Sequence, residues 1–312
     1  MPSKNKASRA TLCLLGLVAR AAATVPVYVM LPLDVISSSG QVTDSAKLQS
    51  QMDQMKSAGV RGVMLDCWFG LVEKTEKQYS FAGYTDVVQL AKGVGLKVEI
   101  IMSFHQCGGN VGDACDIPLP AWVLSSGEDI FYRDQDGHVD HEYISLFADS
   151  ANVVGAAKRS PLQIYSDFMT AFKSAFADEI GSTIVEIEVG AGPAGELRYP
   201  AYQLDRWSFC GIGAFQSYST YANASITQAA AAVGHPEWSG SPNNAGSYDS
   251  LPSETGFFSF SGFDNYASDY GKFFLGWYTD MLVAHGDAVL AAARASFGSS
   301  IKLSLKVAGI HW

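Results

Sequence analysis

Three short apolar segments, each separated from the next by a helical pattern, constrain the fold more than any other feature of this sequence. Val25–Leu31, Gly62–Trp68 and Lys97–Phe104 are rich in apolar and β-branched residues, as buried strands of parallel sheets are. Between them, helical patterns extend from about Asp44 to Gly59 and from about Gly83 to Lys92. Strands that alternate with helices indicate a parallel sheet with crossover helices. We therefore predict an α/β fold.

The same pattern continues with much longer connections. Thr183–Val189 and Ile301–Val307 predict a fourth and a fifth strand. The segment before the fourth strand contains a predicted turn at Asp134–Gly137 and a helix that begins at the dipeptide Ser160-Pro161. The segment before the fifth strand contains a long helix from about Asp269 to Phe297. Both long segments leave the carboxyl ends of strands, where barrel enzymes build their active sites.

The number of strands sets an expectation about closure. Five strand–helix units do not close an eight-unit barrel, and the sequence ends directly after the fifth predicted strand. We therefore expect either an open five-stranded sheet or a barrel cut short after about five of its eight units. In both cases we assign residues 24–312 to this one α/β unit.

The first 23 residues differ from the rest and are excluded from the fold. Lys4, Lys6 and Arg9 precede a short apolar stretch at 11–19, and an Ala-rich segment follows. A basic start, a short apolar stretch and small residues describe a secretory signal, and a plastid or mitochondrial transit peptide fits nearly as well. The apolar stretch is too short to be a transmembrane helix. We expect a targeted protein, either secreted or imported into plastids.

Charge and cysteine spacing exclude several functions. The formal net charge is −10, so the chain has no general affinity for nucleic acids or anionic membranes. The cysteines show no C-x-x-C pair and no spacing typical of zinc ligands. Cys67 lies within a predicted strand, where a buried thiol is common. Aromatic residues are abundant, and they serve either as core or as platforms for sugar rings.

Polar residues gather where the predicted strands end, and this predicts the position of a site. Asp66 lies at the end of the second strand, and the third runs into His105 and a glycine-rich loop that ends at Asp113. The fourth strand leads into the segment Gly190–Pro200, which contains Glu196. The carboxyl ends of parallel strands meet at one edge of a sheet, so these groups should lie together.

These strand ends resemble the β-amylase family of glycoside hydrolases. The matching stretches are VPVYVMLPL, GVMLDCWFG, IMSFHQCGGNVGD, IEVGAGPAGELRYP and IKLSLKVAGIHW, and they occur in the family's order. The resemblance implies a TIM-type (β/α)₈ barrel that hydrolyses α-1,4-glucosidic linkages and releases maltose from the non-reducing ends of starch or maltodextrin, with inversion. It implies no cofactor and no metal.

The resemblance also implies roles for individual residues. Glu196 matches the general acid, and Gly108–Asp113 matches a loop that closes over substrate. The implied sugar-binding positions are Asp66, His105, Asp113, Lys306 and His311. The family's general base falls in a later segment, beyond Trp312. We therefore expect a C-terminally truncated member, and expect the 312-residue chain alone to release maltose at no useful rate.

Elementary chemistry supports the role of Glu196 without the resemblance. Acetal hydrolysis with inversion needs a carboxylic acid at the leaving oxygen and a carboxylate ~6.5–9.5 Å away to activate water. A general acid is kept protonated by apolar or acidic surroundings, so we expect Glu196 to be partly buried among such neighbours. Arg198 is expected to pair with Glu186 or Glu188 on the fourth strand. Trp68 is expected either to stack on sugar or to pack in the core.

Two other functions remain alternatives to an active hydrolase. One is a catalytically inactive fragment that keeps part of a glucan-binding surface. The other is a glucan-binding or regulatory protein that reuses the barrel. The discriminating feature is the general base, because losing the group that activates water costs orders of magnitude in rate.

Overall fold

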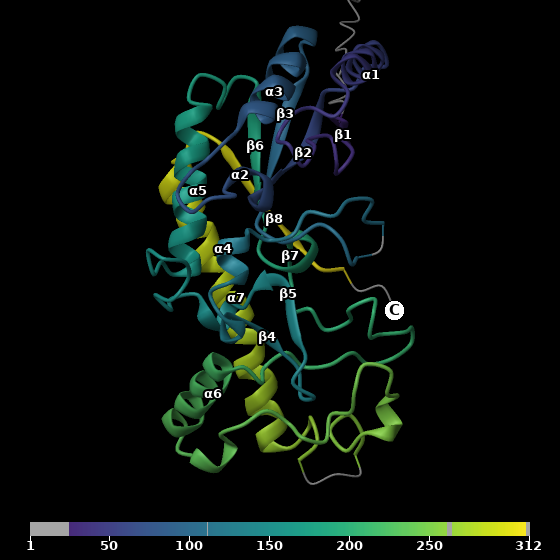
Figure 1. The fold of residues 1–312 in the computed structure, drawn as a ribbon. Helices are drawn as coiled ribbons and strands as arrows, with labels where there is room; N and C mark the ends of the chain where they lie inside the picture. The colour runs from purple at the N-terminus through teal and green to yellow at the C-terminus, as the bar shows by residue number, and fades with distance from the viewer. Residues whose placement is uncertain (1–24, 111, 261–263, 310–312) are drawn as a thin grey trace, which may run out of the picture.

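The computed structural model describes residues 25–309 except 111 and 261–263, so the predicted leader and His311 lie outside the described residues. The helices are α1 (Ser45–Ser57), α2 (Phe69–Val72), α3 (Ala82–Val94), α4 (Ala121–Leu124), α5 (Pro161–Ala175), α6 (Thr220–Ala232) and α7 (Asp269–Phe297). The strands are β1 (Tyr28–Met30), β2 (Gly62–Trp68), β3 (Lys97–Ser103), β4 (Phe131–Arg133), β5 (Val139–Ile144), β6 (Ile184–Val189), β7 (Glu196–Leu197) and β8 (Lys302–Val307). Figure 1 shows the sheet in the upper half of the molecule and α6 in the lower half.

A curled parallel sheet forms the centre of the fold, as the strand–helix pattern predicts. Within the described residues its strand order is β1-β2-β3-β6-β8-β7, and every neighbouring pair is parallel. The five predicted strands are β1, β2, β3, β6 and β8, and they lie in space in the order of the chain. This confirms the α/β fold with a curled sheet, which is consistent with a TIM-type barrel.

The two faces of the sheet differ in character. Residues paired across parallel strands point to the same face, and successive residues alternate between faces. One row on the helix-covered face contains Leu65, Ile100 and Ile187, which are all fully buried. α3 packs on β2 and β3 there, and α7 packs on β6 and β8. The opposite face carries two rows of mostly polar or charged residues: Met64, Glu99, Glu186 and Lys302, then Asp66, Ile101, Glu188 and Ser304.

The four helices that the sequence predicts are α1, α3, α5 and α7, and they lie close to the predicted positions. The carboxylate of Asp44 caps α1 by accepting a hydrogen bond from a backbone N–H. Gly95 ends α3 in the left-handed conformation, which costs glycine little. Ser160 caps α5 and Pro161 takes its first position, as predicted. α7 extends over Asp269–Phe297, the predicted bounds. None of the helices in the described part of the chain has the length and apolarity to cross a membrane.

The long connections contain structure that periodicity does not predict. Asp134–Gly137 forms the predicted turn, but the turn joins β4 and β5 into an antiparallel hairpin. These strands are short and mostly buried on both sides, so they show little alternation of polar and apolar residues. β7 has only two residues, and it pairs Glu196 with Lys306 on β8. This pairing brings the fourth and fifth predicted strand ends together.

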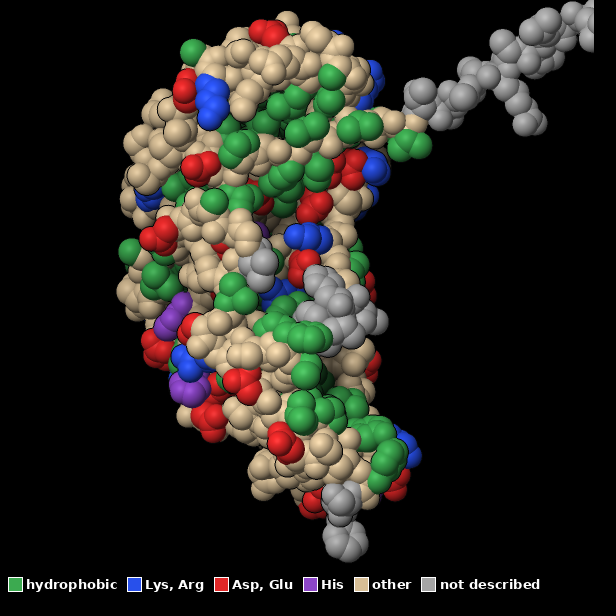
Figure 2. All heavy atoms as spheres, turned by 90° about the vertical axis from the view of Figure 1, so that its right-hand side faces the viewer, with side chains coloured by type: hydrophobic (Ala, Val, Ile, Leu, Met, Phe, Trp, Pro, Cys, Tyr) green, Lys and Arg blue, Asp and Glu red, His purple; other side chains and the backbone are tan. Residues whose placement is uncertain are grey.

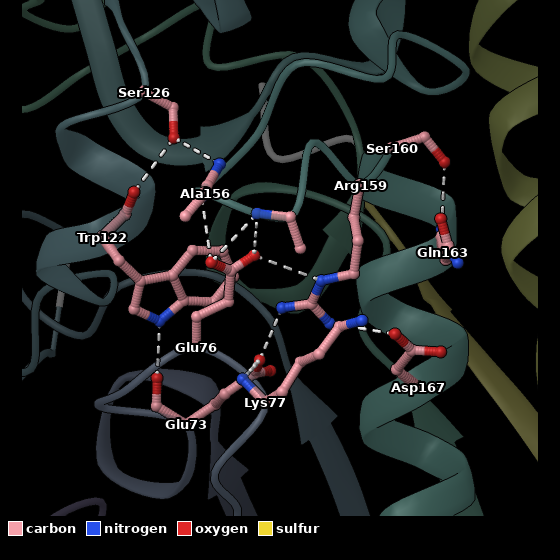
Figure 3. Close-up of polar contacts among 12 residues, drawn as sticks. Glu73, Glu76, Lys77, Trp122, Ser126, Ala156, Arg159, Ser160, Gln163 and Asp167 are labelled. Carbon is pink, nitrogen blue, oxygen red and sulfur yellow. Dashed lines mark hydrogen bonds and ion pairs between the residues drawn. The ribbon is translucent and has the colours of Figure 1, made fainter.

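A buried ion network anchors the helix side of the sheet (Figure 3). Arg159 is 2% exposed, and its guanidinium donates to Glu73 at 2.7 Å and to Asp167 on α5 at 3.0 Å. Its Nε lies 3.6 Å from a carboxylate oxygen of Glu76, and the ring of Trp122 lies against the guanidinium. Glu73 directly follows α2, which continues from β2. The network therefore ties the exit of β2 to α5.

Replacement of Arg159 by Met should destabilise the fold strongly. The substitution leaves the fully buried Glu73 without its cation, and breaking a buried pair in this way costs about 3–5 kcal/mol. The measurement is the free energy of unfolding in urea, with Arg61→Met as control because Arg61 is exposed. Equal decreases in the free energy of unfolding of the two variants would show that the buried network contributes no more stability than an exposed arginine.

Candidate active site

The predicted strand ends converge on one cleft of about 390 Å³. It is lined by Met30, Leu33, Met64, Asp66, Trp68, Ile101, His105, Asn110, Asp113, Glu188, Ala194, Gly195 and Lys306. These residues come from β1, β2, β3, β6 and β8 and from the loops that follow them. Figure 2 shows acidic and basic side chains lying side by side near the middle of this face, with apolar side chains above and below.

Glu196 lies beside this cleft at the start of β7. The turn Pro193–Gly195 precedes it, and Gly195 has a φ of +74° that other residues rarely adopt. A Cβ atom on Gly195 would lie 3.3 Å from the His105 ring, so the turn approaches that ring closely. The Glu196 side chain is 17% exposed. The expectation of partial burial is therefore confirmed.

The expectation about the neighbours of Glu196 is wrong. Its carboxylate faces two cations: Arg198 Nε donates to Oε2 at 2.9 Å, and Lys306 Nζ lies 3.8 Å from Oε1. Extended backbone places residues two apart on the same side, which brings Arg198 to Glu196. The expected pairing of Arg198 with Glu186 or Glu188 is wrong for the same reason. Lys302, the register partner of Glu186, takes that role at 2.6 Å.

Asp66 lies on the polar face of β2, at the bottom of the cleft. It is 8% exposed, and Oδ1 accepts a hydrogen bond from the Ser103 hydroxyl at 2.5 Å. Burial raises the pKa of the Asp66 carboxyl from 3.8 to about 6, and the hydrogen bond from Ser103 opposes this shift. Glu188 faces the same cleft, and burial raises the pKa of its carboxyl as well.

His105 follows β3 and is 7% exposed. Burial, together with the charges of Lys306 and Arg198, lowers the pKa of its imidazole to about 3. The ring is therefore neutral near pH 7. Its Nδ1 is buried, and among the described residues it has no hydrogen-bond partner. Its edge contacts Trp68, which is buried and donates a hydrogen bond to the Leu33 carbonyl. Trp68 thus packs beside the cleft.

The glycine-rich loop is closed at its base. A disulfide joins Cys107 to Cys115, a link that the sequence analysis did not predict. The carboxylate of Asp113 accepts hydrogen bonds from the backbone N–H groups of Gly108 and Asn110, at 2.9 and 3.1 Å. Asp113 also lines the cleft, together with Asp66 and His105. The loop therefore folds back on itself and holds this predicted sugar-binding residue at the cleft.

Lys306 completes the described part of the predicted set. Its ammonium donates to the Ala194 carbonyl at 3.3 Å and remains half-exposed at the cleft. His311, the other residue predicted near this strand end, lies outside the described residues. Four of the five predicted sugar-binding residues therefore line the cleft, and Glu196 borders it through Lys306.

Three residues around the site were not predicted to lie there: Asn110, Glu142 and Arg198. Asn110 and Glu142 form a hydrogen bond of 2.6 Å, and Arg198 donates to the Asn110 side chain at 3.2 Å. Asn110 lies within the glycine-rich loop, whose polar content was a usable signal. Glu142 lies on β5, far along the chain from any other site residue, and nothing in the sequence around it indicates this position.

The arrangement suits the recognition of a polar, uncharged ligand with many hydroxyl groups. Carboxylates accept hydrogen bonds, an ammonium donates them, and a neutral imidazole does both. Glu196 adds a carboxyl group that can transfer a proton at the side of the cleft. In the described part of the chain, no three His, Cys, Asp or Glu side chains gather in a way that could hold a metal ion.

Comparison with known proteins gives one consistent result. Residues 28–312 match the model of glycosyl hydrolase family 14. The chain is 49% identical over 296 residues to chloroplastic β-amylase 1 of Arabidopsis thaliana and 48% identical over 295 residues to a β-amylase of Medicago sativa. Each match covers 92% of this chain, but only 51% and 58% of the relatives. The chain thus spans about half the length of these curated relatives.

A solved structure shows the same fold. The catalytic domain of a β-amylase from Paenibacillus polymyxa superposes with a TM-score of 0.74 at 31% sequence identity. The superposition covers 92% of this chain and 67% of that one.

Replacement of Asp66 by Asn should change how stability depends on pH. The folded state raises the pKa of Asp66 from 3.8 to about 6, so ionising this carboxyl disfavours folding, and the penalty grows as pH rises through that range. Asn removes this penalty and still accepts the Ser103 hydrogen bond. The free energy of unfolding of Asp66→Asn, minus that of the unmodified chain, should therefore increase by about 2 kcal/mol as the pH rises from 4 to 7.

Urea unfolding at the two pH values measures this difference. Asp116→Asn is the control, because Asp116 is exposed beside the same loop. A constant offset between Asp66→Asn and the unmodified chain at both pH values would contradict the assignment.

Proposed function

The chain belongs to glycosyl hydrolase family 14, and from this premise we propose that it hydrolyses α-1,4-glucosidic linkages of starch-type glucans. In this proposal it releases maltose from non-reducing ends with inversion, and Glu196 is the general acid. The single observation that carries the proposal is the convergence of five strands and the loops after them on one cleft lined by Asp66, His105 and Lys306, with Glu196 at its border beside Lys306. Starch, maltodextrin or a related α-1,4-glucan is the proposed ligand.

The proposed reaction separates two tasks between carboxyl groups. Glu196 gives its proton to the glycosidic oxygen as the bond from that oxygen to the anomeric carbon breaks. Water attacks the anomeric carbon from the opposite face of the ring, and a second carboxylate accepts the proton that the water loses. The product therefore has the inverted anomeric configuration. In this proposal the second carboxylate, the general base, lies beyond Trp312.

The other cleft residues are proposed to bind the terminal sugar units. At neutral pH the carboxylate of Asp66 accepts hydrogen bonds from sugar hydroxyls, because its pKa of about 6 keeps it largely ionised. The neutral imidazole of His105 lines the same cleft and is proposed to form a hydrogen bond with a sugar hydroxyl. Lys306 lines the cleft and is proposed to donate hydrogen bonds to sugar hydroxyls, and His311 is proposed to bind sugar as well. Asp113 reaches the ligand from the glycine-rich loop.

The loop Gly108–Asp113 is proposed to close over the bound glucan. Gly108, Gly109 and Gly112 all have positive φ values, so the loop adopts backbone conformations that are strained for other residues. Closure would exclude water from the reacting bond and bring Asp113 against the sugar. The disulfide between Cys107 and Cys115 confines this movement to the residues between them.

Glu196→Gln should abolish product formation and leave binding intact. We assay maltotetraose with and without azide, a small anionic nucleophile that needs no general base. With azide, the unmodified chain should convert maltotetraose into maltosyl azide and free maltose, and Glu196→Gln should lower this rate about 10²–10⁴-fold, the usual contribution of a general acid. Without azide, the unmodified chain should release maltose at no useful rate, because the general base lies beyond Trp312. Maltose binding by calorimetry should be nearly unchanged, because Gln keeps the shape of the side chain.

Two other outcomes lead to different conclusions. Maltose binding without any Glu196-dependent product would establish a glucan-binding protein and overturn hydrolysis. Absence of both binding and product, in a chain shown to be folded by its urea transition, would overturn the assignment of the cleft.

The leader is proposed to direct plastid import. The Arabidopsis thaliana relative is chloroplastic by name, and residues 1–23 have the basic, acid-free composition of a transit peptide. A fluorescent protein fused after residues 1–40 should enter plastids in plant cells. The same reporter fused to residues 24–40 is the control and should stay in the cytosol. Reporter in the culture medium would show secretion instead.

A further inference from the structure

Glu142 contacts both the glycine-rich loop and the turn before Glu196 through a single atom. Its side chain is 7% exposed. Oε1 accepts one hydrogen bond from the Asn110 amide at 2.6 Å and another from the Ala194 backbone N–H at 2.7 Å. Asn110 belongs to the loop, and Ala194 lies two residues before Glu196. One carboxylate oxygen therefore joins two segments that are far apart in the sequence.

The contact with Ala194 fixes an unfavourable backbone conformation. Ala194 has a φ of +52° and a ψ of 24°, the left-handed region, which is unfavourable for a residue with a Cβ. Such a conformation persists only where the surroundings determine it. The short bond to Glu142 is one such determinant, and the bond from Lys306 to the Ala194 carbonyl is another. Together they set the direction in which the chain enters Glu196.

The contact with Asn110 extends the connection to the acid itself. The Asn110 side chain uses its amide for Glu142 and its carbonyl oxygen for Arg198 Nη2, at 3.2 Å. Arg198 Nε in turn binds Glu196 Oε2, and its guanidinium lies over the Tyr202 ring. The contacts form a closed ring from Glu142 through the loop to Arg198, Glu196 and back through Ala194.

From this ring we propose that Glu142 is a positioning residue that latches the glycine-rich loop to the turn carrying Glu196. The proposal rests on the proposed function in so far as Glu196 is taken to be the general acid. When the loop opens, Asn110 leaves both Glu142 and Arg198. Arg198 then lacks one of the hydrogen bonds that hold it against Glu196, so the Glu196 side chain is less firmly positioned while the cleft is open. Closure thus couples substrate enclosure to the placement of the acid.

Amide hydrogen exchange of the ligand-free chain tests the latch without requiring catalysis. Glu142→Ala should raise exchange about tenfold at Gly108, Asn110 and Ala194, the factor expected for one lost hydrogen bond to a charged group. Glu142→Gln should restore most of the protection, because its carbonyl oxygen can accept both hydrogen bonds. Glu99→Ala is the matched control: Glu99 is also a buried glutamate but lies on β3, and it has no hydrogen bond to the described residues of the loop.

A second variant, Asn110→Ala, tests the latch even if Glu142→Ala does not fold. Asn110→Ala removes the loop side of the latch and should raise exchange at Gly108 and Asn110 while leaving Ala194 protected. In maltose titrations, Glu142→Ala should weaken affinity about tenfold, since only the latched fraction binds well, and Glu142→Gln should recover it.

The outcomes separate the latch from the proposed function. Unchanged exchange at Asn110 and Ala194 in Glu142→Ala, or failure of Glu142→Gln to restore it, would overturn the latch. Failure of the unmodified chain to bind maltose would refute the glucan assignment and leave the exchange result standing.

Discussion

The parallel register across β2, β3, β6 and β8 is the constraint on which the rest of the structure depends. It turns alternate residues of every strand toward the same face, so one set meets the helices and the other meets the cleft. A slip of one residue would exchange Leu65 with Asp66 and bury a carboxylate against α3. Packing of the apolar face against the helices therefore fixes the strand register. The register in turn fixes the positions of the charged residues on the opposite face, where the cleft lies.

Burial gives the cleft its electrostatic character. The same low-dielectric surroundings raise the pKa of Asp66 to about 6 and lower that of His105 to about 3, because burial disfavours whichever form is charged. Near neutral pH the cleft thus presents an anion, a neutral imidazole and the ammonium of Lys306. An uncharged polyol can satisfy all three with hydroxyl groups, whereas a charged ligand would meet a like charge. The composition of the whole chain could not reveal this local balance.

The sequence predicts the fold well and the site in part, for different physical reasons. Strands such as Gly62–Trp68 and caps such as Ser160 depend on neighbours along the chain, so periodicity and local chemistry locate them. Asp66, His105, Asp113 and Lys306 follow from the rule that parallel strand ends meet, together with the family resemblance. Glu142 could not be predicted, because its role depends on where the β4–β5 hairpin folds back. The neighbours of Glu196 were mistaken because β7 is too short to show a pattern.

Several residues around the cleft destabilise the folded state, and the buried ion network of Arg159 offsets this cost. Asp66 is buried with a raised pKa, Ala194 is held in the left-handed region, and three glycines give the loop backbone freedom that folding must remove. On the other side of β2, Arg159 joins Glu73 and Asp167 in a network that holds the strand exit against α5. Asp66 and the network meet at the same strand: Asp66 lies on β2, and Glu73 follows the short helix that continues it. A rigid exit is what allows Asp66 to stay buried at an energetic cost, since a mobile strand end would relax and admit water. The polar cleft is therefore maintained by interactions that never touch it.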